Sequence, residues 1–285
     1  MEERDDGSSI RRNEHPLTKY IVSLGWEGFG DRLQCLSYCI DLALSRNRIL
    51  VVNWSDRWFG GFHEYFQLVD VPYAETCPKG KTHPSIFEHL LNVPADYWVF
   101  DLVEQRIDDS SAFITVHSGV GTRTFNYYTL QKHLRFTPQT ALEVAEEMQR
   151  LRNISTLPIV HLRGTDRPWT IEQIQKLADK HGEVALLSDD RFAVEAYLNI
   201  SNGVSLAAAR ADGHPIHKTD TSRQRIIRMF ADFCLLHEYG VGALNEDSLF
   251  WTIAKYIDVK EWFDPAPELV KYEEFFIRPK PFQFL

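Results

Sequence analysis

Short apolar runs and helix-spaced apolar positions alternate along the first half of the chain. Tyr20–Leu24 and Ile49–Asn53 have the length and composition of buried strands. Residues 31–45 lie between them and repeat apolar side chains every three or four positions, which indicates an amphipathic helix. A glycine-rich turn at residues 25–30 precedes this helix, and residues 112–117 have the pattern of a later strand. The order strand, helix, strand predicts a βαβ unit in a parallel sheet.

The same alternation returns after residue 137. Thr137 and Pro138 are residue types preferred at the cap and first position of a helix, which we expect to run to about residue 152. Strand-like and helix-like segments then follow one another to about residue 256, so we predict a second βαβ domain. The expected strands are residues 157–162, 184–188, 204–208 and 239–243, and the expected helices are residues 170–180, a helix opened by residues 189–191, 220–238 and 246–256.

The domain boundary is therefore expected near Thr137. Residues 1–136 would form the N-terminal domain, with a polar leader at residues 1–16, and residues 137–285 would form the C-terminal domain. Its tail, residues 268–285, is rich in proline and phenylalanine and could cross back to pack on the first domain. The fold class expected for both halves is α/β.

Net charge and apolar content narrow the classes of partner. The 285 residues carry a formal net charge of −9, which argues against a nucleic-acid-binding surface. No segment approaches the roughly 18 uninterrupted apolar residues that a membrane span needs. Residues 1–14 also lack the apolar run of a secretory signal. We therefore expect a cytoplasmic protein with no membrane span.

The spacing of cysteine and histidine gives little support for a metal site. Cys35 and Cys39 are four residues apart in the first expected helix, so they are expected to share one helix face. His214 and His217 are three residues apart, but no cysteine lies near them, which disfavours a zinc site. No metal is expected. We expect buried, reduced thiols at all four cysteines: Cys35, Cys39, Cys77 and Cys234.

The turn at residues 25–30 could bring backbone N–H groups close to a ligand at the start of a helix. Gly28 and Gly30 are the glycines nearest to that helix start, and Asp31 is its first acidic residue. The glycine order GxxGxG differs from the dinucleotide fingerprint GxGxxG, and Asn53 rather than an acidic residue ends the second strand. Alternatively, the glycines only permit a tight turn and Asp31 complements the helix dipole.

A charged cluster follows the expected strand at residues 157–162. His161, Arg163 and Asp166 belong to the run HLRGTDR, and ligands of open α/β sheets bind where strands end. The planar guanidinium of Arg163 could hold a diphosphate and stabilise its charge as a leaving group. The alternative is a surface ion pair between Arg163 and Asp166.

Other polar and aromatic residues have both a functional and a structural interpretation. Asp189 and Asp190 follow the strand at residues 184–188 and could bind a nucleobase or ribose, or cap the next helix. Asn245 and Ser248 precede the last expected helix and could contact a phosphate or serve as ordinary caps. The aromatic residues of positions 54–66 could stack on sugar rings or belong to the core.

Four of these segments together resemble the fucosyltransferases, including the α1,6-, α1,2- and protein O-fucosyltransferases and the nodulation fucosyltransferase. The segments are GFGDRL at residues 28–33 with NRILVVNW at 47–54, HLRGTD at 161–166, SDD at 188–190, and residues 232–250. Their order and spacing match the family across about residues 20–257. The resemblance implies a GT-B fold, in which two Rossmann-like βαβ domains face a cleft.

The resemblance also implies an inverting, metal-independent transfer of a sugar from a nucleotide-diphosphate sugar to a hydroxyl of a glycan or glycoprotein. It implies that Arg163 contacts the donor diphosphate and that Asp189 or Asp190 lies near the base or ribose. Ser248 and Phe250 would lie beside the phosphates. Asp31 or Asp166 would be the general base. The expected donor-binding residues are Gly28, Gly30, His161, Arg163, Asp189, Asp190, Asn245, Ser248 and Phe250.

Three positions differ from the family pattern. Gly164 stands where the α1,6 enzymes have a second arginine, Arg167 replaces a lysine, and Asp247 replaces a serine before Ser248. Because these positions surround the expected diphosphate site, the donor stays open. GDP-fucose is the family default, and UDP-xylose or another GDP-sugar is the alternative. The alternative functions are a non-catalytic nucleotide-sugar-binding module and a dinucleotide-dependent oxidoreductase.

Overall fold

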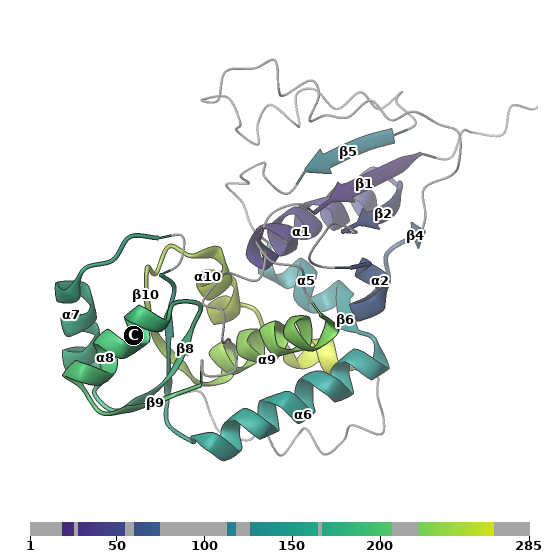
Figure 1. The fold of residues 1–285 in the computed structure, drawn as a ribbon. Coiled ribbons are helices and arrows are strands. Elements are labelled where there is room, and N and C mark those ends of the chain that lie inside the picture. The colour runs from purple at the N-terminus through teal and green to yellow at the C-terminus, as the bar shows by residue number, and fades with distance from the viewer. Residues whose placement is uncertain are drawn as a thin grey trace, which may run out of the picture.

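The computed structural model describes residues 19–25, 28–54, 60–74, 113–117, 126–164, 167–206 and 222–264. Within them lie two parallel sheets, one from the first half of the chain and one from the second, with helices packed around them (Figure 1). The expected leader and tail, residues 1–16 and 268–285, lie outside the described residues, as do Cys77, Asp166, His214 and His217.

The first sheet contains the βαβ unit that the sequence predicts. β1 (Tyr20–Leu24), α1 (Phe29–Ser45) and β2 (Ile49–Asn53) follow the expected order, and the two strands pair in parallel. The sheet order is β4-β2-β1-β5, with β4 at Tyr73–Ala74 and β5 at Phe113–His117, which confirms the strand expected there. Strands are added on both sides of β1, as in a Rossmann-like sheet.

A two-stranded antiparallel sheet and two short helices follow. α2 (Phe62–Tyr65) runs directly into β3 (Phe66–Leu68). α5 (Tyr127–His133) likewise runs into β6 (Leu134–Phe136), which pairs with β3. Among the aromatic residues of positions 54–66, Trp58 and Phe59 lie outside the described residues. The described ones are all buried, which supports their interpretation as core rather than as a sugar-stacking surface: Trp54, Phe62, Tyr65 and Phe66.

The second half of the chain begins with α6 (Pro138–Ile154), and its start is as predicted. The hydroxyl of Thr137 accepts a hydrogen bond from the Thr140 N–H at 3.3 Å, and Pro138 stands in the first turn. This bond satisfies one of the N–H groups that a helix start leaves without an intrahelical partner. The domain boundary near Thr137 stays a prediction.

The second sheet has the order β10-β7-β8-β9, with every pair of strands parallel. Its strands and helices match the predicted order closely. The last helix begins at Leu249 rather than at residue 246, because residues 245–248 form a turn in which Asn245 has a φ of 61°. The elements are β7 (Ile159–Leu162), α7 (Ile171–His181), β8 (Val184–Ser188), α8 (Arg191–Ile200), β9 (Gly203–Ser205), α9 (Arg223–Tyr239), β10 (Gly240–Leu244) and α10 (Leu249–Tyr256).

The order of the second sheet creates a topological switch point. The chain adds β8 and β9 on one side of β7, then returns to add β10 on the other side. The connections leaving β7 and β10 therefore turn to opposite faces of the sheet and leave a crevice at the carboxyl ends of these two strands. This topology makes the segments after Leu162 and Leu244 the first place to look for a ligand site.

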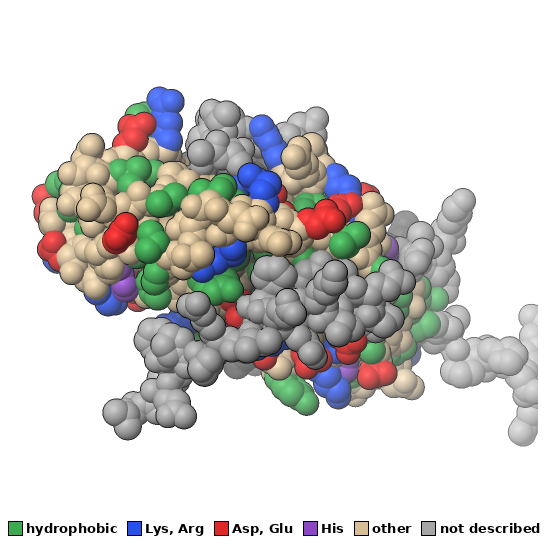
Figure 2. Space-filling view, turned by 90° about the horizontal axis from the view of Figure 1, so that it is seen from below, with side chains coloured by type: hydrophobic (Ala, Val, Ile, Leu, Met, Phe, Trp, Pro, Cys, Tyr) green, Lys and Arg blue, Asp and Glu red, His purple; other side chains and the backbone are tan. Residues whose placement is uncertain are grey.

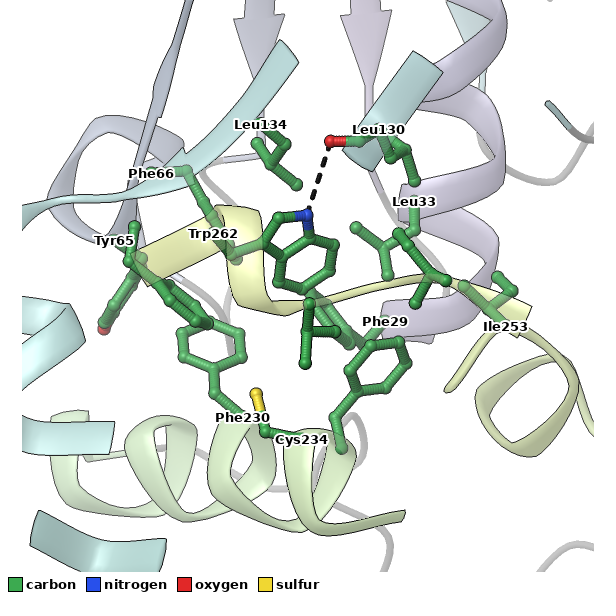
Figure 3. Packing of buried hydrophobic residues seen from close by; sticks show 14 of the residues in the cluster. Phe29, Leu33, Tyr65, Phe66, Leu130, Leu134, Phe230, Cys234, Ile253 and Trp262 are labelled. Atoms are coloured by element: carbon green, nitrogen blue, oxygen red, sulfur yellow. Dashed lines mark hydrogen bonds between the residues drawn. The ribbon is translucent and has the colours of Figure 1, made fainter. Parts of the chain in front are cut away.

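One large cluster of buried apolar side chains includes residues from β1, α1, α6 and α9. The short helix η4 (Lys260–Phe263) inserts Trp262 into this cluster, where its ring stacks on Phe233 with centroids 5.7 Å apart. The Trp262 Nε1–H donates to the Leu130 carbonyl of α5 at 3.3 Å (Figure 3). The chain therefore already crosses back to the first half at η4, before the tail at residues 268–285.

The described cysteines agree with the sequence prediction. The Cys35 and Cys39 sulfur atoms lie 3.9 Å apart on one face of α1, and both residues and Cys234 are buried free thiols. Burial raises the pKa of the Cys39 thiol well above its usual value, with a further contribution from Cys35, and burial likewise raises the pKa of Cys234. The Cys39 and Cys234 thiols are therefore held in their protonated, weakly nucleophilic form.

Candidate functional site

Arg163 and Asn245 meet at the crevice of the second sheet. Arg163 directly follows β7 and Asn245 directly follows β10. The Asn245 side-chain amide donates to the Arg163 carbonyl at 2.8 Å, so the two loops are joined through the Arg163 backbone. Asn245 has a left-handed backbone conformation, which asparagine tolerates better than most residues. Both residues thus follow parallel strands that are neighbours in the sheet, and they lie at the same carboxyl edge.

Asp189 lies beside Arg163 and is almost fully buried. One carboxylate oxygen accepts a hydrogen bond from the Gly164 N–H at 3.0 Å, and the other lies 3.5 Å from the Arg163 Nε. A buried carboxylate needs such partners, because an uncompensated charge in this environment is unfavourable. Asp189 therefore orients Arg163 and the start of its loop, a role that the sequence interpretation did not assign to it.

Asp190 serves as the cap of α8. One of its oxygens accepts from the backbone N–H groups of Phe192 at 2.8 Å and Ala193 at 3.4 Å, which supports the capping interpretation. The other oxygen accepts from the Trp169 indole N–H at 2.9 Å. The sequence interpretation missed Trp169, and its only signal was an aromatic residue between the charged loop and the Thr170 cap.

The position of Asp190 explains why Gly164 is a glycine. A β-carbon at position 164 would lie 2.8 Å from the Asp190 β-carbon and still closer to its Oδ2. Real side chains do not approach this closely, so any larger residue would displace Asp190 or the loop. The place of the second arginine of the α1,6 enzymes is therefore closed in this chain.

Ser248 stands at the start of α10, next to the same crevice. It is buried, and its N–H donates to the Asn245 carbonyl at 3.0 Å. Because α10 follows β10, its N-terminus and the partial positive charge of that end lie at the carboxyl edge of the sheet. Phe250 packs against the His161 ring with centroids 5.6 Å apart and against Phe233 at 5.2 Å. His161 at the end of β7 and Phe250 in the first turn of α10 thus pack against each other.

The start of α1 lies against the start of α10. A β-carbon at Gly30 would lie 2.8 Å from the Leu249 β-carbon and 2.9 Å from the Phe250 nitrogen, so Gly30 permits a close approach of two helices. Gly28 caps α1, and a β-carbon there would lie 3.3 Å from a carboxylate oxygen of Asp31. Asp31 is half-buried in the first turn. The two helix starts therefore bring Asp31 of the first half toward Ser248 of the second.

Arg32 is a second residue that the sequence interpretation missed. It is fully buried, its guanidinium donates to the Trp54 carbonyl at 3.2 Å, and it lies 5.8 Å from the centre of the Trp54 ring. A β-carbon at Gly25 would contact both of these side chains. Arg32 therefore joins the first turn of α1 to the residue that follows β2. A charged residue on the buried face of the expected helix was the available signal.

Arg167 and Asp247 form an ion pair across the crevice, with Arg167 Nη1 and Asp247 Oδ2 2.6 Å apart. Arg167 belongs to the loop after β7 and Asp247 to the turn before α10. Both side chains are exposed, with exposed fractions of 42% and 71%. Two of the three positions that depart from the family pattern are thus partners of each other.

Among the described residues no group of three histidine, cysteine, aspartate or glutamate side chains could hold a metal ion. In the same part of the chain, no helix combines the length and apolar character of a bilayer span. On the face shown in Figure 2, described basic and acidic side chains are interspersed, so this face presents no broad basic field. The cytoplasmic location stays a prediction.

Neither a family model nor a curated protein matches this sequence. Solved structures do. The NodZ alpha-1,6-fucosyltransferase co-crystallised with GDP is 15% identical with a TM-score of 0.59, and the match covers 84% of this chain and 92% of that one. NodZ from Bradyrhizobium is 16% identical with a TM-score of 0.58 over the same shares. NodZ soaked with GDP-fucose is 15% identical with a TM-score of 0.57, over 83% and 91% of the two chains.

These matches confirm the predicted fold class. The chain has an α/β fold of the GT-B type, with two Rossmann-like parallel sheets, and it shares this fold with a fucosyltransferase over most of both chains. At 15–16% identity the likeness establishes the fold. Function depends on the residues at the crevice between β7 and β10.

Proposed function

We propose that the protein is a glycosyltransferase that moves a sugar from a nucleotide-diphosphate sugar to a hydroxyl of a glycan or glycoprotein. The observation that carries this proposal is the position of Arg163. Asp189 and Asn245 hold it at the switch-point crevice, beside the N-terminus of α10. The shared fold supports it, because the matching NodZ structures include one with GDP and one soaked with GDP-fucose.

The chemistry follows from the charge that develops on the donor. The acceptor oxygen attacks the anomeric carbon on the face opposite the diphosphate, a new carbon–oxygen bond forms, and the bond to the phosphate oxygen breaks with inversion. The nucleoside diphosphate leaves with the bonding electron pair. The Arg163 guanidinium and the N-terminal end of α10 would stabilise its negative charge, which lowers the barrier. In this proposal these groups take the place of a divalent metal ion.

A carboxylate would accept the proton of the attacking hydroxyl. We propose Asp31 or Asp166 for this role. Asp31 is half-buried at the start of α1, whose first turn packs against α10 and therefore lies near the candidate phosphate site. Asp166 follows Arg163 in the sequence by three positions. Asp189 and Asp190 are less suitable, because each already accepts hydrogen bonds that fix a loop or a helix start.

We propose GDP-fucose as the donor and fucose as the transferred sugar, since a matching NodZ structure was soaked with GDP-fucose. UDP-xylose and other GDP-sugars stay as alternatives. The closed position at Gly164 and the acidic side chain of Asp247 alter the surroundings of the diphosphate relative to the family pattern. The donor therefore has to be measured.

A thermal-shift panel tests the proposal. GDP, UDP, GDP-fucose, UDP-xylose and NAD would be added with and without EDTA, because a ligand that binds only the folded protein raises its melting temperature. We expect stabilisation by the GDP or UDP compounds, unchanged by EDTA. Arg163→Ala should abolish this stabilisation, whereas Arg150→Ala, which removes an exposed arginine of α6, should retain it. Stabilisation by NAD alone would instead support an oxidoreductase.

Turnover is the second part of the test. The GDP-sugar or UDP-sugar that stabilises the protein would be incubated with a panel of glycans and glycoproteins, and nucleoside diphosphate release would be followed. Acceptor-dependent release supports the transferase. Tight donor binding with no transfer to any acceptor would favour the non-catalytic binding module.

A further inference from the structure

The Arg167–Asp247 ion pair joins the loop after β7 to the turn before α10, at the crevice proposed for the donor diphosphate. Arg167 follows Arg163 in the loop after β7, and Asp247 directly precedes Ser248 at the start of α10. A separate link, the Asn245 side chain to the Arg163 carbonyl at 2.8 Å, joins the same two loops. The crevice therefore does not depend on the ion pair to keep its loops together.

The charges of Arg167 and Asp247 would affect the binding of a diphosphate in opposite directions. A diphosphate at the N-terminus of α10 would be attracted by Arg163 and by the helix end, but it would be repelled by the carboxylate of Asp247. Arg167 is the described cation paired with that carboxylate, at 2.6 Å. The same guanidinium is suited to bind phosphate oxygens. Asp247 and an incoming phosphate would thus both bind the Arg167 guanidinium.

We propose that Asp247 is a specificity-determining residue that competes with the donor diphosphate for the guanidinium of Arg167. The inference rests on the proposed function, because it requires a diphosphate in this crevice. Binding exchanges the Arg167–Asp247 pair for an Arg167–phosphate pair, and the Asp247 side chain turns into solvent. Its exposed fraction of 71% allows that rotation.

Because both side chains of the pair are exposed, the exchange costs little free energy. An ion pair between exposed side chains contributes little to stability, so breaking it costs less free energy than a charged ligand gains on binding. Each ligand that binds Arg167 still loses this free energy from its own binding. Asp247 therefore weakens the binding of any nucleotide and favours ligands with enough phosphate charge to displace it.

Isothermal titration with GDP as the probe tests this inference. Asp247→Asn should tighten GDP binding roughly two- to fivefold, the range expected when an exposed ion pair no longer competes. Arg167→Gln should weaken binding. In the double variant, Asp247→Asn should have a smaller effect than in the wild-type background, because the side chain for which Asp247 competes is gone. Asp179→Asn is the matched control: it removes one exposed negative charge from the end of α7 that points away from the crevice.

The outcomes separate this inference from the proposed function. If the wild-type protein binds neither GDP nor UDP, the proposed function fails and this inference fails with it. If the wild-type protein binds GDP but Asp247→Asn binds it equally or more weakly, the ion pair only stabilises the two loops. In that case the inference is overturned and the proposed function is not. An equal or larger effect of Asp247→Asn in the absence of Arg167 would also overturn it, since that result indicates direct charge repulsion between Asp247 and the diphosphate. Melting temperatures without ligand should be similar for all variants, because the pair is exposed.

Discussion

At the scale of single residues, the polar side chains at the crevice bind neighbouring side chains and backbone groups. Asp189 holds the Gly164 N–H and lies 3.5 Å from Arg163, while the Asn245 amide holds the Arg163 carbonyl. Asp190 fixes the start of α8 and the Trp169 indole. Asp189 is therefore pre-organised beside Arg163, and in the proposed reaction it would position Arg163 rather than accept a proton. Asp31 and Asp166 stay the residues that we propose as the general base.

Replacing Asp31 and Asp166, one at a time, by asparagine would show which of them is the general base. We expect either Asp31→Asn or Asp166→Asn to lower the rate of sugar transfer by about 10²- to 10⁴-fold, the usual contribution of a general base. Donor affinity should change little, because an amide preserves the size of the side chain. Transfer rates and GDP dissociation constants would be measured for both variants, with Asp179→Asn as a control. Full transfer activity in both would remove the two residues from the mechanism.

At the scale of helices and strands, the apolar periodicity of the sequence was sufficient to predict most of the fold. β1, α1 and β2 and the alternation from α6 to α10 have apolar periodicity and caps that can be read directly. β3 and β6 could not be predicted, because three-residue strands show no clear alternation and pair across a long stretch of chain. The roles of Asp189 and of the Arg167–Asp247 pair also depend on which strands are neighbours, which a single sequence does not specify.

The contact between α1 and α10 gives a prediction at this scale. Gly30→Ala would place a β-carbon 2.8–2.9 Å from Leu249 and Phe250, so the two helix starts must move apart. Overpacking of this kind destabilises proteins by about 1–3 kcal/mol. Because Ser248 caps α10 at the candidate phosphate site, we also expect weaker GDP binding. Urea unfolding and GDP titration would measure the two effects. Ser45→Ala, at the exposed end of the same helix, should change neither, and unaltered stability in Gly30→Ala would disprove the close contact.

At the scale of the whole molecule, the two halves share one core. Trp262 of η4 is fully buried between α9 and the segment from α5 to β6. Figure 3 shows its ring surrounded by Phe66 and Leu134 from the first half of the chain and by Phe230 and Cys234 from α9. A shared core of this size couples the folding of both halves. It also keeps α1 and α10 in a fixed relation, on which the candidate site depends.

This coupling predicts a single unfolding transition. Circular dichroism and tryptophan fluorescence should give the same midpoint in a urea titration, since neither half can lose its structure without exposing the shared core. Trp262→Ala should lower the free energy of unfolding by about 3–5 kcal/mol, as expected for removal of a buried aromatic ring. Trp262→Phe keeps most of the apolar volume and should have a smaller effect, which gives a measurement if the alanine variant does not fold. Two separate transitions, with Trp262→Phe shifting only one of them, would mean that the halves fold independently. The shared core would then not be what keeps the starts of α1 and α10 together.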